Sequence, residues 1–399
     1  MKPLARMFSV LLLIFLAGCL LTLTTWPIQQ MADISVGEVA ATDIHVTKET
    51  HNDGDSVSLV RARQHMKPNR PIENSTPVDE NTTLHVSDES KSRSRPHKRY
   101  LIYLCDDMRS CGGWGDRQRG MVAAYLLAVV TGRQFGINMS YPCDIKMFYV
   151  PNMVNWYVLV KDIRGLNWEI VDWMDNRKDE VDVESDFNIQ HPSDVIFLKT
   201  NQDIINRIRR SRRYGRNIPK TLKDKSRAKV FQTVWENLMK KSFHFEERLD
   251  RFMSRVPEKT DLVCAHVRMR KNPNMLSDAS QINALSSVDT LWRFLSKFKN
   301  TSRIFVASDS VEVRNSARKW FGDREIDTDG VVLHIDRQGH ASSACIGLEM
   351  ALLDQAILSL CKVLVVSTSN FSIRGAMMSK LKQKLYMFEN GTISTFNLS

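Results

Sequence analysis

The chain has 399 residues, of which 43% are hydrophobic and only 17 are glycine and 12 proline. This composition excludes fibrous and wholly disordered proteins, and it is sufficient for buried hydrophobic cores. Lysine and arginine outnumber aspartate and glutamate by 56 to 45, which gives a formal net charge of +11. The charge favours an anionic partner, such as nucleic acid, anionic lipid, a sulfated glycan or the phosphates of a nucleotide sugar.

The N-terminus contains an apolar run from Met7 to Trp26 without a single charge, preceded by Lys2 and Arg6. At about 1.5 Å per residue, a helix of this length crosses the roughly 30 Å hydrocarbon layer of a membrane, and its positive flank stays cytoplasmic. A cleaved signal peptide is the alternative, but the run is long for one and no small-x-small site follows it. We predict an uncleaved transmembrane signal-anchor behind a cytoplasmic tail of residues 1–6.

Residues 27–98 contain no aromatic side chain and are rich in polar and charged residues. Such a segment buries too little apolar area to offset its ordering entropy, and we predict a disordered stem. The anchor, the stem and the glycosylation sequons together predict a single-pass type II Golgi membrane protein with a lumenal body, the endoplasmic reticulum being less favoured. The sequons begin at Asn74, Asn81, Asn138, Asn300, Asn370, Asn390 and Asn397.

Six cysteines follow the anchor, on the side of the membrane where disulfides persist. They are Cys105, Cys111, Cys143, Cys264, Cys345 and Cys361. Six cysteines allow fifteen pairings. A bridge among the first three would clamp a Gly-rich loop, whereas Cys264 and Cys361 adjoin apolar runs and fit buried free thiols equally well. No Cys-x-x-Cys pair or zinc-type His/Cys spacing occurs, so no structural metal is predicted.

From Tyr100 onward, β-branched and aromatic runs alternate with helical stretches, which indicates an α/β fold. The first half has predicted strands at Tyr100–Cys105, Phe135–Met139 and Val195–Lys199, a helix at Asp116–Arg133, and a long amphipathic helical stretch at Lys223–Val256. The second half has predicted strands at Leu262–Arg268, Arg303–Ser308, Val331–Ile335, Val363–Ser367 and Leu385–Phe388. Its predicted helices are Leu285–Phe298, Val311–Phe321, Cys345–Leu360 and Ser372–Lys382. Parallel strands joined by helices bind ligands at the carboxyl ends of the strands.

A Gly-rich turn, Cys111–Arg117, lies between the first predicted strand and helix. Glycines let a backbone approach a phosphate, and the N–H groups that open the helix point toward it. A plain tight turn is the alternative. The turn is not a Walker loop, because no Gly-Lys-Ser/Thr follows it.

Two more segments lie at predicted strand ends. His266 and Arg268 share one face of their strand, where arginine offers a planar fork for a diphosphate and histidine can bond to a sugar or base. The segment from Asp354 to Ser372 reads as a helix, a buried strand and a hydroxyl-rich loop that opens another helix, which again suits phosphate. A His–Arg surface pair and an ordinary capped helix are the respective alternatives.

These three segments, in this order, resemble the inverting fucosyltransferases, which include the α1,2-, core α1,6- and protein O-fucosyltransferases. That family has a Gly-x-Gly-Asn-Arg turn, a His-x-Arg strand end and an Asp-x-x-x-Leu-Ser…Ser-x-Phe-Ser stretch. The matching positions here are Gly113 to Arg117, His266 to Arg268, Asp354 to Ser359 and Ser369 to Ser372. The resemblance covers Tyr100 to Phe388, and it is weak between Met147 and Arg255.

The resemblance implies a GT-B-like α/β fold with two facing Rossmann-like domains, an acceptor-side domain of residues 99–257 and a GDP-sugar-binding domain of residues 258–399. It implies GDP-fucose as the donor substrate and a glycan or glycoprotein as the acceptor. No Asp-x-Asp motif stands at a strand end. We therefore expect no metal and no other cofactor, with Arg268 supplying the positive charge.

The resemblance also assigns roles to single residues. Arg268 would hold the β-phosphate, and His266 and Asp354 would contact guanosine. Ser367, Ser369, Phe371 and Ser372 would line the diphosphate, and Gly113, Gly115 and Arg117 would close over the fucose. Asp309 matches a strand-end Ser-Asp pattern of the family, although it is also well placed to cap a helix.

The sequence departs from the family at two places. Met269 and the residues after it replace the Gly-Asp that α1,2 enzymes have after the arginine, and Asp116 replaces an asparagine of the Gly-rich turn. A carboxylate at 116 could serve as the catalytic base for an acceptor hydroxyl, although phosphates would repel it. An ion pair with Arg117 or Arg119 is the alternative.

Two other classes share the membrane layout. A Golgi sulfotransferase would need a basic phosphosulfate loop after its first strand, which Cys111–Arg117 does not supply. A catalytically inactive, glycan-binding relative would lose donor contacts that this sequence retains. Nucleic-acid binding is disfavoured because a lumenal body does not meet nucleic acid.

Overall fold

The computed structural model describes residues 98–108, 110–174, 182–271, 278–330, 332, 333, 335 and 343–398. The predicted anchor Met7–Trp26 and all but the last residue of the predicted stem lie outside these ranges. Among the described helices, only Ser343–Leu360 has the length and hydropathy of a membrane span. Most of it is buried in the protein, as in the core helix of a globular body.

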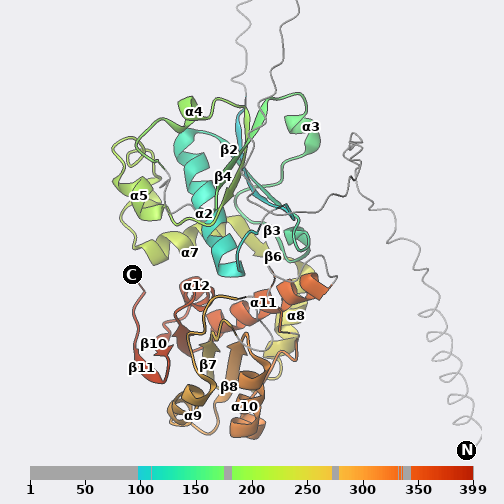
Figure 1. The fold of residues 1–399 in the computed structure, drawn as a ribbon, viewed down its shortest axis with the longest axis vertical. Coiled ribbons are helices and arrows are strands. Elements are labelled where there is room, and N and C mark those ends of the chain that lie inside the picture. The colour runs from blue at the N-terminus through green and yellow to red at the C-terminus, as the bar shows by residue number, and fades with distance from the viewer. Residues whose placement is uncertain are drawn as a thin grey trace, which may run out of the picture. The chain divides into compact units, whose positions relative to one another are not determined.

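The first half of the described chain contains a four-stranded sheet in the order β2-β1-β5-β4, with every neighbouring pair parallel. Its strands are β1 (Tyr100–Cys105), β2 (Gln134–Met139), β4 (Trp168–Trp173) and β5 (Val195–Thr200). Helix α2 (Trp114–Thr131) connects β1 to β2 and packs on the sheet (Figure 1). Strand β4 was not predicted: it is an edge strand whose Trp168 and Ile170 are exposed, so its apolar residues do not mark a buried face.

The second half contains a five-stranded sheet in the order β11-β10-β9-β7-β8. All neighbours are parallel except the hairpin of β10 and β11. The strands are β7 (Leu262–Val267), β8 (Arg303–Ser308), β9 (Val363–Ser367), β10 (Lys384–Glu389) and β11 (Thr392–Thr395). The predicted strand Val331–Ile335 is wrong: Val332, Leu333 and Ile335 belong to no strand and line a cavity instead.

Successive side chains of β7 point to opposite faces of the second sheet, and both faces are buried. Val263, Ala265 and Val267 pack in one cluster with α9 (Val288–Leu295) and α10 (Val311–Phe321). Leu262 and Cys264 point the other way, into a core shared with α11 (Ser343–Leu360) and the first sheet. Helices α11 and α12 (Asn370–Met378) therefore lie between the two sheets (Figure 1).

The predicted helical stretch Lys223–Val256 is two helices. Ser226 caps α7 (Arg227–Leu238) and Ser242 caps α8 (Phe243–Met253). Between them, β6 (Met239–Lys241) pairs antiparallel with β3 (Tyr149–Pro151), and this pairing extends the chain and breaks the helix. The remaining short helices are α3 (Val160–Ile163), α4 (Phe187–Gln190), α5 (Ile205–Arg210) and α6 (Lys220–Lys223), with 3-10 turns at Ile145–Met147, Leu285–Ser287 and Gly322–Arg324.

The six body cysteines form three disulfides. Cys105–Cys111 closes the loop that precedes α2, as the sequence suggested for this region. Cys143–Cys345 joins the loop after β2 to α11, across 202 residues of chain. Cys264 is bonded to Cys361, so the free-thiol alternative for this pair is wrong.

Candidate active site

A cavity of about 310 Å³ opens at the carboxyl ends of β7, β8 and β9, facing the N-terminus of α2. Eight of the predicted site residues line it: Gly113, Gly115, Asp116, His266, Arg268, Asp354, Ser369 and Phe371. The lining also includes Asp309. Arg117, Ser367 and Ser372 are buried beside it and bond to the turn or to His266.

The Gly-rich turn brings α2 against α12. Gly112 has a φ of +78°, which only glycine adopts without strain. A Cβ on Gly115 would lie 2.6 Å from the carbonyl carbon of Asn370, so glycine is required for this close approach of two helices. Arg117 holds the turn from behind, because it is fully buried and donates to the carbonyl of Gly112 at 2.9 Å.

Asp116 stands at the start of α2 and accepts a hydrogen bond from the Asn370 amide at 2.9 Å. It also pairs with Arg119 at 3.1 Å, the partner that the sequence offered as an alternative. Asn370 itself lines the cavity, so a glycan on this sequon would obstruct the site.

His266 lies on β7 with its Nδ1 2.9 Å from the Ser372 hydroxyl and its ring 5.0 Å from that of Phe371. Burial and the neighbouring Arg268 lower the pKa of His266 to about 3. The imidazole is therefore neutral at physiological pH and has one donor and one acceptor nitrogen. Ser367 donates to the carbonyl of His266 at 2.5 Å and so holds this strand end against β9.

Arg268 follows β7 and is held by two carboxylates. It pairs with Asp309 at the end of β8 and with Asp278 at 2.5 Å. Asp309 also accepts from the backbone N–H groups of Met269 and Arg270, at 2.7 and 2.9 Å. The helix-cap alternative for Asp309 is wrong, because Ser310 caps α10.

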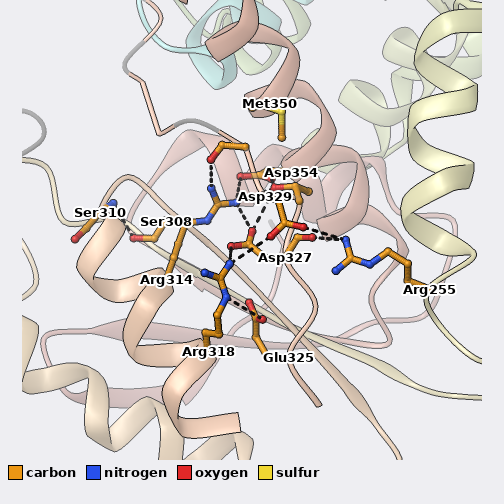
Figure 2. Close-up of polar contacts among 12 residues, drawn as sticks. Arg255, Ser308, Ser310, Arg314, Arg318, Glu325, Asp327, Asp329, Met350 and Asp354 are labelled. Carbon is orange, nitrogen blue, oxygen red and sulfur yellow. Dashed lines mark hydrogen bonds and ion pairs between the residues drawn. The ribbon is translucent and has the colours of Figure 1, made fainter. Parts of the chain in front are cut away.

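At the other end of the cavity, Asp354 of α11 pairs with Arg314 at 3.4 Å (Figure 2). Asp354 also accepts from the Thr328 hydroxyl at 2.9 Å. Burial raises the pKa of Asp354 to about 6, against the lowering effects of Arg314 and Thr328. The adjoining wall is apolar. It consists of Val332, Leu333, Ile335 and Met350.

Sequence reasoning missed two groups of residues. Arg314 and Thr328 belong to segments far from Asp354 in the chain, and no local pattern marks either of them. Gln355 donates to Gln118 at 2.9 Å and to the Phe371 carbonyl at 2.8 Å, and it accepts from the Trp114 indole at 2.7 Å. It thereby ties the two walls of the cavity together, and its only sequence signal is its place inside the Asp354–Ser359 stretch.

Within the described ranges, no group of three or more His, Cys, Asp or Glu side chains is arranged to hold a metal ion.

The sequence matches no family model and no curated protein. The structure is similar to that of a single-residue mutant of FUT1 from Arabidopsis thaliana in complex with GDP, with 14% identity over 74% of this chain and 71% of that chain and a TM-score of 0.53. It is also similar to the fucosyltransferase NodZ from Bradyrhizobium (14% identity, 75% and 99% coverage, TM-score 0.47) and to POFUT1 in complex with GDP-fucose (10%, 74% and 99%, 0.43). The described body thus has an α/β fold with parallel sheets that resembles the GT-B fucosyltransferases.

Proposed function

We propose that the protein is a glycosyltransferase that moves L-fucose from GDP-fucose to a glycan or glycoprotein acceptor, with inversion at the sugar carbon. One observation carries the proposal: a single cavity brings together the Gly-rich turn, the His266–Arg268 strand end, Asp354 and the start of α12. The FUT1 structure, whose fold this chain resembles, is a complex with GDP.

In this proposal the cavity has a phosphate end and a base end. The phosphate end consists of Arg268, Asp309 and the Ser369–Phe371 start of α12, where helix N–H groups favour an anion. The base end consists of Asp354, Arg314 and Thr328 beside the apolar wall. Neutral His266 lies between them and can bond to the sugar or base without repelling or attracting a phosphate.

Transfer requires that GDP leave with a growing negative charge and that the acceptor hydroxyl lose a proton. The Arg268 guanidinium, fixed by two carboxylates, offsets the charge on the leaving diphosphate, which is the role a metal ion has in other transferases. We propose Asp116 as the base. Its carboxylate lines the cavity and stays partly exposed beside its partners Asn370 and Arg119, whereas Asp309 and Asp354, the other carboxylates among the described lining residues, are buried.

We also propose that residues 99–257 bind the acceptor and that residues 258–399 bind the donor. The signal-anchor would place both in the Golgi lumen. Alkaline carbonate washing of membranes tests the anchor: the full chain should stay with the membranes and be sensitive to glycosidase. Quantitative release of a shortened soluble form would show that Met7–Trp26 is a signal peptide.

Ligand-dependent stabilisation distinguishes the proposed activity from its alternatives. A soluble fragment beginning near Arg95 should be stabilised by GDP and not by adenosine 3′,5′-bisphosphate, because a ligand that binds only the native state raises the melting temperature. The opposite preference would indicate a sulfotransferase. Stabilisation by neither would indicate a glycan-binding relative that has lost the donor site.

A further inference from the structure

Residues 205–229 form a basic segment with eleven lysine or arginine residues and a single aspartate, in a chain whose formal net charge is +11. The rest of the sequence is therefore almost neutral. The basic segment comprises α5, α6 and the start of α7. None of its residues is among the described residues that line the active-site cavity, so the proposed transfer does not use this charge.

The basic segment is a folded surface and not a flexible tail. Ile208 of α5 and Leu222 of α6 are buried, and α5 packs against α2 and α7 (Figure 1). Arg209 of α5 donates to the carbonyl of Lys223 at the end of α6, at 2.6 Å, and so joins the two helices. The backbone that carries the charges is thus fixed before a ligand binds, and less conformational entropy is lost on binding than in a disordered basic tail.

The charges of the basic segment differ in their partners. Arg213 pairs with Asp186 at 2.9 Å, and Arg227 pairs with Asp203 at 2.6 Å, so these two arginines are neutralised within the protein. Like charges on neighbouring helices repel one another, and an anionic ligand would offset that repulsion. Four exposed side chains of the segment make no ion pair with any carboxylate of the described residues: Arg210, Arg216, Lys220 and Lys223.

A second cavity, of about 310 Å³, lies where the basic segment enters α7. Ser226 and Lys229 line it from the start of α7, and Lys382 and Gln383 line it from the loop between α12 and β10. Apolar side chains such as Leu385 complete the lining. Hydroxyl and amide groups bind sugar hydroxyls, and ammonium groups bind an anionic substituent. The cavity therefore suits a sugar ring that carries a negative charge.

We propose that the basic segment, with this cavity at its end, binds a sulfated glycan. Guanidinium groups meet oxyanions as planar forks, and lysine adds positive charge. Dense lysine and arginine runs are typical of surfaces that bind heparin or nucleic acid, and the proposed lumenal location favours the glycan. It also disfavours a membrane, because the anionic surface potential belongs to the cytoplasmic leaflet. The inference rests on the proposed location of the body and not on the transfer of fucose.

Titration of the soluble body with a heparin oligosaccharide of defined length tests the proposal. The test variant combines four substitutions: Arg210→Gln, Arg216→Gln, Lys220→Gln and Lys223→Gln. Its affinity should fall by about tenfold or more, the combined size of four exposed ion pairs. All four positions are exposed, so the variant should unfold at the wild-type temperature or higher.

A matched control removes the same number of arginines and lysines from exposed positions in and beside α3 and in and beside α9. It combines Lys161→Gln, Arg164→Gln, Arg293→Gln and Lys297→Gln. Heparin affinity should stay within about twofold of the wild type, because long-range attraction between exposed charges is screened by salt. An equal loss of affinity in both variants would show that heparin responds to net charge alone, and would overturn the inference.

The choice of ligand separates a glycan surface from a membrane surface. Heparin from which the sulfates have been removed keeps its carboxylates, and it should bind about tenfold or more weakly than heparin because it has fewer charges for the guanidinium groups. Phosphatidylserine vesicles should not bind. Vesicle binding tighter than heparin binding, and lost in the test variant, would assign the surface to a membrane and contradict the proposal.

GDP separates this inference from the proposed function. Saturating GDP should leave heparin affinity unchanged, because the basic segment lies outside the lining of the active-site cavity. Competition between the two ligands would place heparin in the active-site cavity and overturn the inference. A body that binds heparin through the basic segment but does not bind GDP would support the inference and contradict the proposed function.

Discussion

The two ends of the cavity use the same pair of charged groups in opposite roles. At the proposed phosphate end, Arg268 faces the ligand and two carboxylates, Asp309 and Asp278, hold it. At the proposed base end, Asp354 faces the ligand and Arg314 and Thr328 hold it. A charged side chain that binds a ligand must be held in one orientation. An oppositely charged side chain behind it holds it there, but also competes with the ligand for its hydrogen bonds. Substitutions at the two ends should therefore differ in the kinetic step that they impair.

The largest expected effect follows Arg268→Lys. Lysine retains the positive charge and lacks the planar fork that meets two diphosphate oxygens at once. Loss of a preorganised donor to a leaving group typically costs about 3 kcal/mol, and we expect turnover to fall a hundredfold or more at saturating donor and acceptor. Near wild-type turnover in this variant would contradict the expectation that substitutions at the phosphate end impair the chemical step.

Asp354→Ala should impair binding more than chemistry. In the proposed arrangement its carboxylate contacts the base, which is remote from the bond that breaks, so its loss should affect the ground state and the transition state alike. We expect the KM for GDP-fucose to rise by about tenfold to a hundredfold with kcat little changed, because two hydrogen bonds to a charged acceptor are lost. Steady-state kinetics over a range of donor concentrations measure both parameters. A fall in kcat at unchanged KM would contradict the assignment.

Asp309→Asn tests whether the carboxylates at the phosphate end position the arginine. The amide keeps the shape and can still accept one backbone hydrogen bond, but it no longer pairs with Arg268. We expect turnover to fall about tenfold, the size of one lost charge-assisted hydrogen bond, with little change in GDP affinity. An unchanged turnover would show that Asp309 serves only the backbone of Met269 and Arg270.

The sequence marked more of the residues at the proposed phosphate end than at the proposed base end. The buried strands β7 and β8 are rich in β-branched and apolar residues, and their ends carry His266, Arg268 and Asp309. Predicting such a strand from the sequence therefore also locates the residues at its carboxyl end. Asp354 came from the family resemblance alone, and Arg314 and Thr328 were missed, because three separate segments meet there only after packing. The strand predicted at Val331–Ile335 failed for a related reason: its apolar residues line the cavity instead of a sheet.

In the fold, too, the sequence predicts features that depend on local residues better than features that depend on contacts between distant segments. Strand β1 and helix α10 have the predicted bounds, since each is marked by local periodicity and, for α10, by the capping Ser310. The break between α7 and α8 depends on the pairing of β6 with the distant β3, which no local pattern records. The disulfide pairing likewise depends on tertiary structure, because sequence alone cannot choose among fifteen alternatives.

The pH dependence of GDP-fucose binding provides a smaller effect that should arise from the base end alone, because the diphosphate diester of this donor has no terminal phosphate that titrates near pH 6. Asp354 can accept with both carboxylate oxygens only when it is ionised, because protonation turns one of them into a donor. Burial raises its pKa to about 6, while Arg314 lowers it and Asp327 raises it. Affinity should be constant at higher pH and fall as the pH drops through about 6, approaching tenfold per unit. His266 stays neutral over this range because its pKa is about 3. The dependence should disappear in Asp354→Asn, and its persistence there would assign it to another group.

The effect of Asp354 on the free energy of unfolding has the opposite pH dependence. Native Asp354 binds its proton at a higher pH than an unfolded aspartate, so its contribution to the free energy of unfolding decreases as the pH rises from about 4 to about 6. Thermal unfolding without nucleotide, compared between the wild type and Asp354→Asn, measures this contribution. A contribution that increases with pH over the same range would show that the carboxyl is stabilised in its ionised form.

Removal of divalent metal ions should not change turnover. If Arg268 provides the charge that offsets the leaving diphosphate, EDTA in the assay should leave turnover unchanged and added magnesium should not restore Arg268→Lys. A loss of activity with EDTA that magnesium reverses would show that a metal shares the role of the arginine.

Release of GDP from GDP-fucose tests the central claim most directly. The soluble body is mixed with GDP-fucose and a panel of glycan and glycoprotein acceptors, and GDP and fucosylated product are measured together. We expect equal amounts of both, a β-linked donor fucose converted to an α-linked product, and loss of both in Arg268→Lys. Intact GDP-fucose with every acceptor, in a protein that GDP nevertheless stabilises, would show a nucleotide-binding protein without transferase activity and would contradict the account.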